Sequence, residues 1–198
     1  MKKIIIVRHG QTNSNAKGLT QGQIDTDLNT IGIEQAKKAG MFIRNNYNIF
    51  EAWVSDLKRT QQTAKEIIKE FKTSKLLREM SFGKWENHLF KNIISEYPKL
   101  VKEYAEASDS FRAPEGESFG DMHVRSVNFI EKINMNDQKE ILIVSHGGFM
   151  RVLLCSILGL PKKNLLNFQF ENCSITEIIK YENKEPILTK INYTDHLN

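Results

Sequence analysis

The sequence predicts an α/β fold, a three-layer α/β/α sandwich built on a mostly parallel sheet. Short apolar runs typical of buried strands alternate along the chain with longer segments whose apolar residues have helical spacing. The runs at 4–7 and 141–144 are continuous stretches of Ile, Leu and Val, the pattern of strands that are covered on both faces. At 198 residues the chain has the length of one domain, and its composition indicates no domain boundary.

The first half of the chain is predicted to begin with the buried strand at 4–7, which stops at the polar pair Arg8-His9. Residues 13–29 are polar and contain glycine, which indicates a long loop, and loops of this length are often functional. Asn29 or Thr30 can cap the helix that follows. Helices are expected here at 31–46 and 57–71, and further strands at 50–55 and 75–77.

The second half of the chain begins with a segment of mixed character. Residues 78–87 are predicted to be irregular, and residues 90–107 have helical spacing that Pro98 splits into two pieces. We expect a single domain, 1–198, with a helical insertion at about 78–117 that forms part of an active-site wall. The alternative, favoured for most of its aromatic residues, is that they are simply core packing. Ser118 and Asp121 have the spacing of a capping box. The remaining helices are expected at 119–134 and 149–158, and the remaining strands at 140–145, 174–181 and 187–192.

Composition argues against several classes of protein. Charged residues make up 26% and hydrophobic residues 40% of the chain, and no apolar run approaches the roughly 18 residues that cross a bilayer. The apolar run after the N-terminal lysines is too short for a signal peptide, so the expected location is cytoplasmic, without a membrane partner. The net charge of +4 is scattered without a basic stripe, which argues against nucleic acid as a partner.

Metal and cofactor chemistry are not predicted either. The two cysteines, Cys155 and Cys173, lack CxxC spacing and closely spaced histidines, so we expect reduced core thiols and no zinc site. The sequence also lacks the GxGxxG pattern of dinucleotide binding and the GxSxG elbow of serine hydrolases. The sequence therefore predicts a protein without a metal or a cofactor.

Two histidines stand at the ends of predicted strands. His9 follows the first strand and precedes Gly10, and His146 follows the strand at 140–145 in the same way. The carboxyl ends of parallel strands meet at one edge of a sheet, where ligands of open α/β sheets bind. An Arg-His pair after a strand is also an ordinary loop feature. The second strand that ends in His and Gly favours a functional site.

These strand ends resemble the histidine phosphatase superfamily, which includes the cofactor-dependent phosphoglycerate mutases. Pieces in the family's order span most of the chain: Arg8-His9-Gly10-Gln11-Thr12, Asn15, Gln21-Gly22, Asp27-Leu28-Asn29, Gly32, Gln35-Ala36, Ser55-Asp56-Leu57-Lys58-Arg59-Thr60, Thr63-Ala64, Leu77-Arg78-Glu79, Phe82-Gly83, Trp85-Glu86, Gly116-Glu117-Ser118 and Ser145-His146-Gly147-Gly148. The resemblance implies a six-stranded mixed sheet with one antiparallel strand. It also implies a phosphatase branch similar to alpha-ribazole phosphatase and broad-specificity phosphatases.

Phosphoryl transfer needs a nucleophile, positive charge around the phosphoryl oxygens and a proton for the leaving oxygen. Neutral imidazole is a nucleophile near neutral pH, so His9 is expected to form a phosphohistidine. Arg8, Arg59 and His146 are expected to surround the phosphoryl group. Arg59 would lie in the first turn of a helix, where it can hold an anion, and the alternative is a surface arginine offset by Asp56.

The expected proton donor is Glu79, which fills the family's acid position and is preferred to Glu86. A carboxyl group here can protonate the leaving oxygen and then, as a carboxylate, activate water. The alternative is a surface carboxylate paired with Arg78. The residues expected to bind substrate are Asn15, as a neutral donor, and, by resemblance, Gln21 and Gly22 at the mouth of the site.

The function expected from this set is a metal-independent phosphatase that hydrolyses small phosphorylated metabolites. A phosphoglycerate mutase is the alternative within the family, although mutases usually carry extra sequence around the mouth of the site. A catalytically silent, anion-binding regulatory protein is the alternative of another class. Asn87 departs from the family, whose members often carry Gly there, and this departure concerns the shape of the wall. The sequence predicts neither the physiological substrate nor the oligomeric state.

Overall fold

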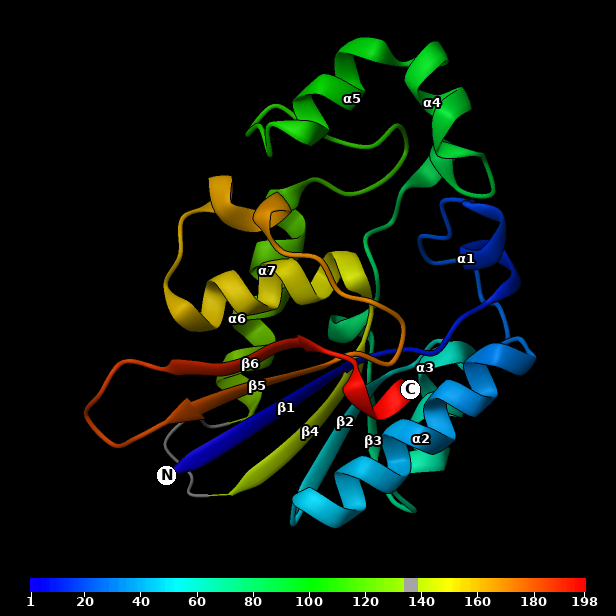
Figure 1. Ribbon diagram of the computed structural model, residues 1–198. Helices are drawn as coiled ribbons and strands as arrows, with labels where there is room; N and C mark the ends of the chain where they lie inside the picture. The colour runs from blue at the N-terminus through cyan, green and yellow to red at the C-terminus, as the bar shows by residue number, and fades with distance from the viewer. Residues whose placement is uncertain (134–138) are drawn as a thin grey trace.

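The computed structural model describes residues 1–133 and 139–198 (Figure 1). Its strands are β1 Lys2–Arg8, β2 Glu51–Ser55, β3 Lys72–Ser74, β4 Glu140–Ser145, β5 Ile175–Lys180 and β6 Ile187–Tyr193. Its α-helices are α1 Asn13–Lys17, α2 Thr30–Asn46, α3 Lys58–Ile67, α4 Phe90–Glu96, α5 Pro98–Ala105, α6 Phe119–Lys132 and α7 Gly147–Leu158. Short 3-10 helices are η1 Lys75–Leu77, η2 Gly83–Trp85, η3 Lys162–Asn167 and η4 Asp195–Leu197.

The strands form one six-stranded mixed sheet in the order β3-β2-β4-β1-β5-β6. β1 pairs in parallel with β4, and β4 and β3 both pair in parallel with β2. β5 runs antiparallel to both of its neighbours, β1 and β6. Among the described strands β5 alone therefore opposes the others, which confirms the mixed sheet with one antiparallel strand.

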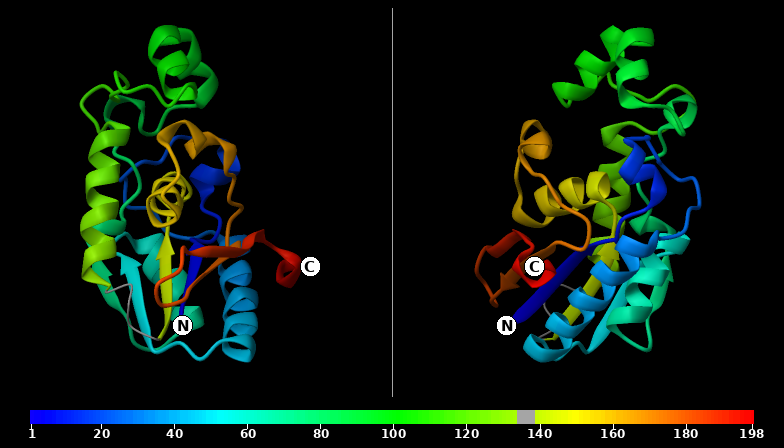
Figure 2. Two further views of the ribbon diagram at one scale, coloured as in Figure 1. Left: turned by 90° about the vertical axis from the view of Figure 1, so that its left-hand side faces the viewer. Right: turned by 45° about the vertical axis from the view of Figure 1, so that its right-hand side comes forward.

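Helices cover both faces of the sheet, as the two views of Figure 2 show. Ile4 and Ile6 of β1 belong to the apolar cluster on the side of α6 and α7, whereas Ile5 and Val7 belong to the cluster on the side of α2 and α3. Both faces of the central strand are buried because its four apolar residues alternate between these two clusters. The predicted three-layer α/β/α arrangement is confirmed.

Several predicted boundaries differ from the structure. The strand expected at 75–77 is η1 instead, because the Ser74 side chain accepts from the Leu76 N–H and ends a strand placed three residues earlier. The helix expected to reach residue 71 ends at Ile67, after which the backbone becomes extended. The loop expected at 13–29 contains the short helix α1, whose Thr12 and Asn15 form a reciprocal capping box. The end of the helix expected at 119–134, residue 134, lies outside the described residues.

The segment 78–117, which we call the helical segment, lies over the carboxyl ends of the parallel strands (Figure 1). It contains η2, α4 and α5, and Pro98 at the start of α5 separates the two α-helices, as predicted. Its aromatic residues pack on one another, with the rings of Tyr104 and Phe111 5.2 Å apart. This packing holds one side of the helical segment above the end of β1.

The described residues contain neither a candidate membrane-spanning helix nor a candidate metal cluster. No described helix combines the length and the apolar character needed to span a bilayer. No cluster of three or more His, Cys, Asp or Glu side chains in the described chain could hold a metal ion.

Candidate active site

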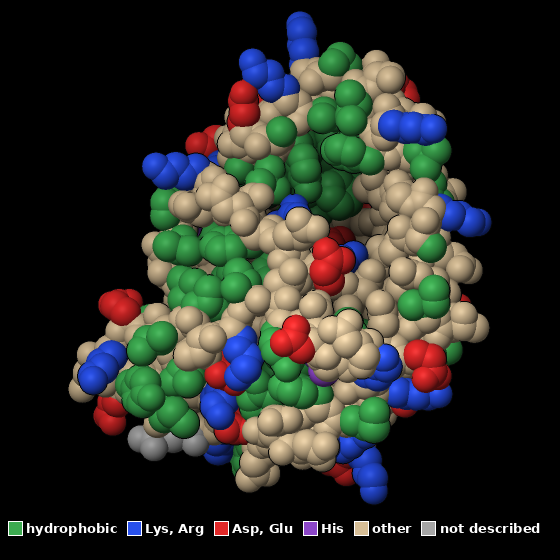
Figure 3. Space-filling view, in the orientation of Figure 1, with side chains coloured by type: hydrophobic (Ala, Val, Ile, Leu, Met, Phe, Trp, Pro, Cys, Tyr) green, Lys and Arg blue, Asp and Glu red, His purple; other side chains and the backbone are tan. Residues whose placement is uncertain are grey.

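A cavity of about 210 Å³ lies between the carboxyl end of β1 and the helical segment. Figure 3 shows a hollow in this region, with hydrophobic side chains gathered on its upper wall. Seven of the eight predicted site residues line the cavity, and His146 lies buried beside His9. The lining residues are Arg8, His9, Asn15, Leu19, Thr20, Gln21, Gly22, Arg59, Glu79, Phe82, Phe90 and Tyr104.

His9 is held at the end of β1 in one orientation. Its backbone N–H donates to the Ser145 carbonyl at 2.9 Å, and its Nδ1 lies 2.7 Å from the Gly10 carbonyl oxygen. A carbonyl oxygen can only accept, so Nδ1 carries the hydrogen and Nε2 of the neutral ring carries the lone pair. Burial, then the charges of Arg59 and Arg8, hold the pKa of His9 well below its ordinary value of 6.5. The ring is therefore neutral and nucleophilic at neutral pH.

Residue 10 is glycine at a point where the backbone of α2 comes very close to the chain. A Cβ atom at this position would lie 2.4 Å from the Gly32 carbonyl oxygen at the start of α2. The Gly10 N–H donates to the Thr63 hydroxyl of α3 at 3.0 Å. The start of α2 and the middle of α3 thus fix the backbone that carries His9.

His146 directly follows β4 and lies against His9, with ring centroids 5.2 Å apart in an edge-to-face arrangement. Its Nε2 is 2.9 Å from the Ser55 hydroxyl, whereas its buried Nδ1 has no partner among the described residues. Burial, then the charge of Arg59, lowers the pKa of His146 well below 6.5. If Ser55 donates to Nε2, Nδ1 carries a hydrogen that is available to an anion.

Arg59 is fully buried and reaches the cavity from the first turn of α3. Its two terminal nitrogens donate to the carbonyl oxygens of Ile24 and Gly22, each at 2.8 Å. Burial lowers the pKa of Arg59 to about 10. The alternative of a surface arginine offset by Asp56 is wrong, because Asp56 pairs with Arg78 at 2.7 Å.

Arg8 is the last residue of β1 and directly precedes His9. Its Nη1 donates to the Phe170 carbonyl at 2.6 Å, and burial lowers the pKa of the guanidinium. The buried Nε atoms of Arg8 and Arg59 have no hydrogen-bond partner in the described part of the chain. Buried donors without partners cost free energy, so this pair and His146 Nδ1 suit a bound anion.

Glu79 is anchored at the N-terminus of α7. Its Oε1 accepts from the N–H groups of Met80 and Phe149 at 2.9 Å each, and its Oε2 accepts from the Gly148 N–H at 2.9 Å. These three N–H groups fix the position of the Glu79 carboxyl group beside the cavity. The predicted alternative, an ion pair between Glu79 and Arg78, is wrong.

Three further cavity residues are joined by hydrogen bonds. The Asn15 side chain accepts from the Thr12 N–H at 3.1 Å, and the Thr12 hydroxyl donates to Gln21 at 2.9 Å. Gly22 has φ +53°, and a Cβ there would lie 2.0 Å from a Glu86 carboxylate oxygen. These contacts fix the loop that carries the Gly22 carbonyl toward Arg59.

Two residues near the site were not predicted to take part in it. Glu86 accepts from the N–H groups of Gln23 and Phe82 at 3.0 Å each. These bonds connect the loop that carries Gln21 and Gly22 to the helical segment. Arg151 lies one turn after Gly148 on α7, and it borders a small space beside the cavity. The helical spacing of Gly148 and Arg151 was the signal in the sequence that both face the same way.

Comparison with known proteins places this geometry in one family. A family model described as the histidine phosphatase superfamily (branch 1) matches residues 4–194. The chain is 29% identical over 203 residues to phosphoserine phosphatase 1 of Hydrogenobacter thermophilus, covering 100% of this chain and 95% of that protein. It is 34% identical over 183 residues to a Yersinia pestis protein named Probable phosphoglycerate mutase GpmB, covering 90% of this chain and 85% of that protein.

Solved structures are similar over the whole length. Phosphoserine phosphatase from Entamoeba histolytica has been determined with 3-phosphoglyceric acid and, as a mutant, with phosphoserine. Both structures superimpose with a TM-score of 0.89 at 29% sequence identity, and the alignments cover 100% of each chain.

Proposed function

The chain belongs to the histidine phosphatase superfamily and is an enzyme that hydrolyses phosphomonoesters, and we propose that it works through a phosphohistidine on His9. One observation carries the proposal. The neutral ring of His9 keeps its hydrogen on Nδ1, against the Gly10 carbonyl, and leaves a lone pair on Nε2 beside two buried arginines. The guanidinium groups supply the positive charge, so the proposed reaction uses no metal ion.

The first step transfers the phosphoryl group to the enzyme. His9 Nε2 attacks phosphorus, the bond to the ester oxygen breaks, and Glu79 gives its proton to the departing oxygen. The Nδ1–H bond to the Gly10 carbonyl remains and stabilises the positive ring of the phosphohistidine. Arg8, Arg59 and the Nδ1–H of His146 receive the charge of the phosphoryl oxygens.

The second step returns the enzyme to its starting state. The Glu79 carboxylate takes a proton from water, the oxygen of that water attacks phosphorus, and the N–P bond breaks with its electron pair returning to Nε2. Phosphate leaves, and Glu79 is again protonated. The three N–H groups that hold Glu79 keep one carboxylate in place for both steps.

The substrate proposed is a small phosphomonoester. A cavity of about 210 Å³ has room for a compact leaving group. Among proteins similar to this chain, one is named phosphoserine phosphatase and one was determined with phosphoserine and with 3-phosphoglyceric acid. These names support small phosphorylated acids as the first compounds to test.

The test is phosphate release in EDTA from phosphoserine, 3-phosphoglycerate and p-nitrophenyl phosphate. We expect wild-type turnover on at least one compound, and a loss of about 10⁴-fold or more in His9→Ala, because a covalent mechanism has no other nucleophile. His123→Ala, which changes an exposed histidine on α6, serves as the control. Full activity of His9→Ala would overturn the proposed mechanism.

A phosphoglycerate mutase is the second candidate, favoured by the relative that carries this name. The same preparation would then convert 3-phosphoglycerate to 2-phosphoglycerate after priming with 2,3-bisphosphoglycerate, faster than it releases phosphate. An inactive protein that nevertheless binds phosphate would indicate the regulatory alternative.

A further inference from the structure

Arg151 differs from the other arginines in the described chain in having no fixed anionic or carbonyl partner. Each of the others donates to a carboxylate or to a backbone carbonyl oxygen. Arg151 makes no such bond within residues 1–133 and 139–198, and its Nε is buried without a partner. A cation held in the protein without a counter-charge is available to an anionic ligand.

The position of Arg151 directs this charge toward the proposed reaction centre. Gly148, whose N–H holds Glu79, lies three residues earlier on α7 and therefore on the same face of the helix. Side chains of a helix lean toward its N-terminus, so the Arg151 guanidinium points toward Gly148. Burial is the main cause that lowers the pKa of Arg8, and the charge of Arg151 acts in the same direction, which places the two cations near each other.

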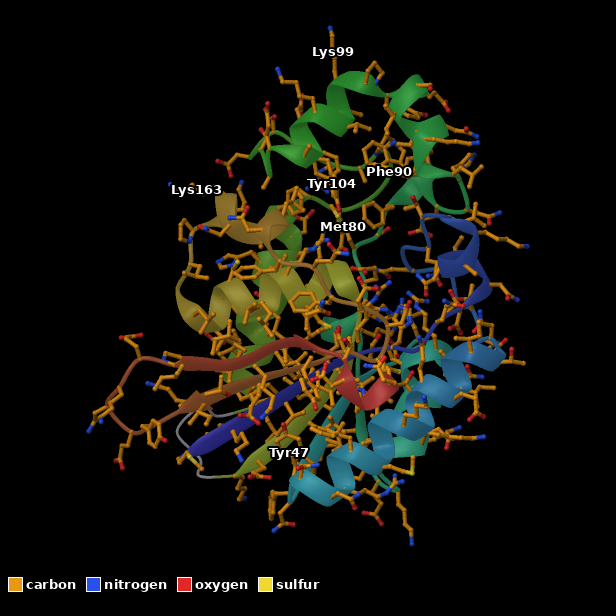
Figure 4. All side chains as sticks on the ribbon, viewed as in Figure 1. Tyr47, Met80, Phe90, Lys99, Tyr104 and Lys163 are labelled. Atoms are coloured by element: carbon orange, nitrogen blue, oxygen red, sulfur yellow. The ribbon has the colours of Figure 1, made fainter. Side chains whose placement is uncertain are left out.

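Aromatic residues join Arg151 to the cavity. Phe82 and Tyr104 line both the cavity and the small adjoining space bordered by Gly148 and Arg151. The Tyr104 hydroxyl interacts with the Arg151 guanidinium. Tyr104 lies on the side of α5 that faces the rest of the molecule, beside Phe90 (Figure 4). A leaving group in the cavity would therefore contact Tyr104 and lie next to Arg151.

The charges around the cavity also favour a second anionic group on the substrate. Arg8, Arg59 and Arg151 bring three positive charges, and the phosphoryl group of a monoester dianion brings two negative ones. Besides Glu79, Glu171 acts on Arg8, and Asp25 and Glu86 act on Arg59. Arg151 forms no ion pair with a described carboxylate, so a carboxylate on the leaving group would supply its counter-charge.

We infer that Arg151, supported by the Tyr104 hydroxyl, binds a carboxylate on the leaving group and so sets the preference of the enzyme for phosphorylated acids. This inference rests on the proposed function and deepens it. Guanidinium suits the role because its planar donors match the two oxygens of a carboxylate.

The experiment compares matched substrates that differ in the carboxylate. Steady-state kinetics are measured for 3-phosphoglycerate against glycerol 3-phosphate, and for phosphoserine against phosphoethanolamine. The proteins are wild type, Arg151→Met, which keeps an unbranched apolar stem, Arg151→Lys, which keeps the charge, and Arg44→Met, a control on α2. Thermal melts show whether each variant is folded.

Wild type is expected to prefer the carboxylate member of at least one pair by tenfold or more in kcat/KM. Arg151→Met is expected to raise KM for that member about tenfold and to change KM for the other member of the pair less than threefold. Arg151→Lys is expected to restore part of the preference. Equal losses on both members, or no loss on either, would overturn the inference. Wild-type turnover that depends on His9 but ignores the carboxylate would overturn it and leave the proposed function intact. Silence on all four compounds would overturn the inference, and silence on p-nitrophenyl phosphate as well would overturn the proposed function.

Discussion

The two walls of the cavity are built in different ways. The sheet wall, Arg8, His9 and Arg59, comes from the end of β1 and the start of α3, and Arg59 and His9 are 0% and 3% exposed. The helical-segment wall, Phe82, Phe90 and Tyr104, comes from 78–117, and Phe90 is 41% exposed. Buried charged groups fixed by backbone bonds suit a reacting phosphoryl group, whereas an apolar, partly open wall suits a variable leaving group. We therefore expect the sheet wall to serve mainly the proposed reaction and the helical-segment wall to contact mainly the leaving group.

Glu79 connects the two walls, and its replacement is expected to have the largest effect. The residue begins the helical segment, but its carboxylate is held by α7. Glu79→Gln removes the proposed proton donor and should lower kcat about 10²- to 10³-fold on alkyl phosphates. The loss should be smaller on p-nitrophenyl phosphate, whose leaving group needs no proton.

Glu86→Gln is the matched control, because this carboxylate also lies near the cavity but bonds to the Gln23 and Phe82 N–H groups. We expect a change below tenfold. If Glu86→Gln proved more damaging than Glu79→Gln on alkyl phosphates, the acid would have been assigned to the wrong carboxylate.

Gly148→Ala tests the position of the Glu79 carboxyl group by changing the residue of α7 that binds it. A Cβ here would lie 2.5 Å from Glu79 Oε1, so the carboxylate would have to move. We expect kcat/KM to fall about tenfold, since a misplaced acid transfers its proton less well. Alanine favours helix, so the melting temperature should hardly change.

Gly120→Ala on α6 is the control for this substitution, because its nearest neighbour would be the Ser118 hydroxyl at an ordinary 3.5 Å. Unchanged kinetics in Gly148→Ala would mean that the position of Glu79 is not limiting.

Acid should lower the free energy of unfolding, because burial lowers the pKa of both His9 and His146 well below 6.5. Between these lowered values and 6.5 the unfolded chain binds more protons than the folded one, so stability falls as the pH falls. At pH 5.5 the free energy of unfolding should be lower than at pH 7.5 by on the order of 1 kcal/mol for each histidine.

Urea unfolding at the two pH values measures this loss, and His9→Gln should lose less than wild type. The partly buried His196, whose pKa burial also lowers, contributes equally to both proteins. The acid limb of kcat/KM should likewise lie below pH 6.5. The same pH dependence in both proteins would contradict the lowered pKa of His9.

The sheet wall was largely predictable from the sequence because its signals are local. The apolar run of β1 ends just before Arg8 and His9, and the helix start places Arg59 beside a strand end. Contacts between distant residues were not predictable: Glu79 is bound by N–H groups about 70 positions away, and His146 meets a hydroxyl 91 positions away. Periodicity reports which face of an element is buried and says nothing of which distant groups meet there.

Asn87 shows a sequence departure that the backbone explains. Its φ is +62°, a left-handed conformation that glycine adopts freely and asparagine tolerates better than most residues. Its N–H donates to the Thr20 carbonyl at 2.8 Å, so the exchange keeps the turn beside the cavity. The departure from the family's glycine therefore needs no change in the path of the wall.

Phe90→Ala is expected to have the smallest effect and tests the division between the walls most directly. Loss of one apolar contact of about 1 kcal/mol should raise KM for phenyl phosphate about fivefold. KM for phosphoethanolamine, which has no ring to contact Phe90, should change less than twofold. Because His9, Arg59 and Glu79 keep their contacts, kcat should stay within twofold for both compounds. Ile94→Ala, on the same helix but outside the cavity lining, is the control. A tenfold fall in kcat with an unchanged melting temperature would show that the helical-segment wall takes part in the chemistry, and the division drawn between the two walls would then fail.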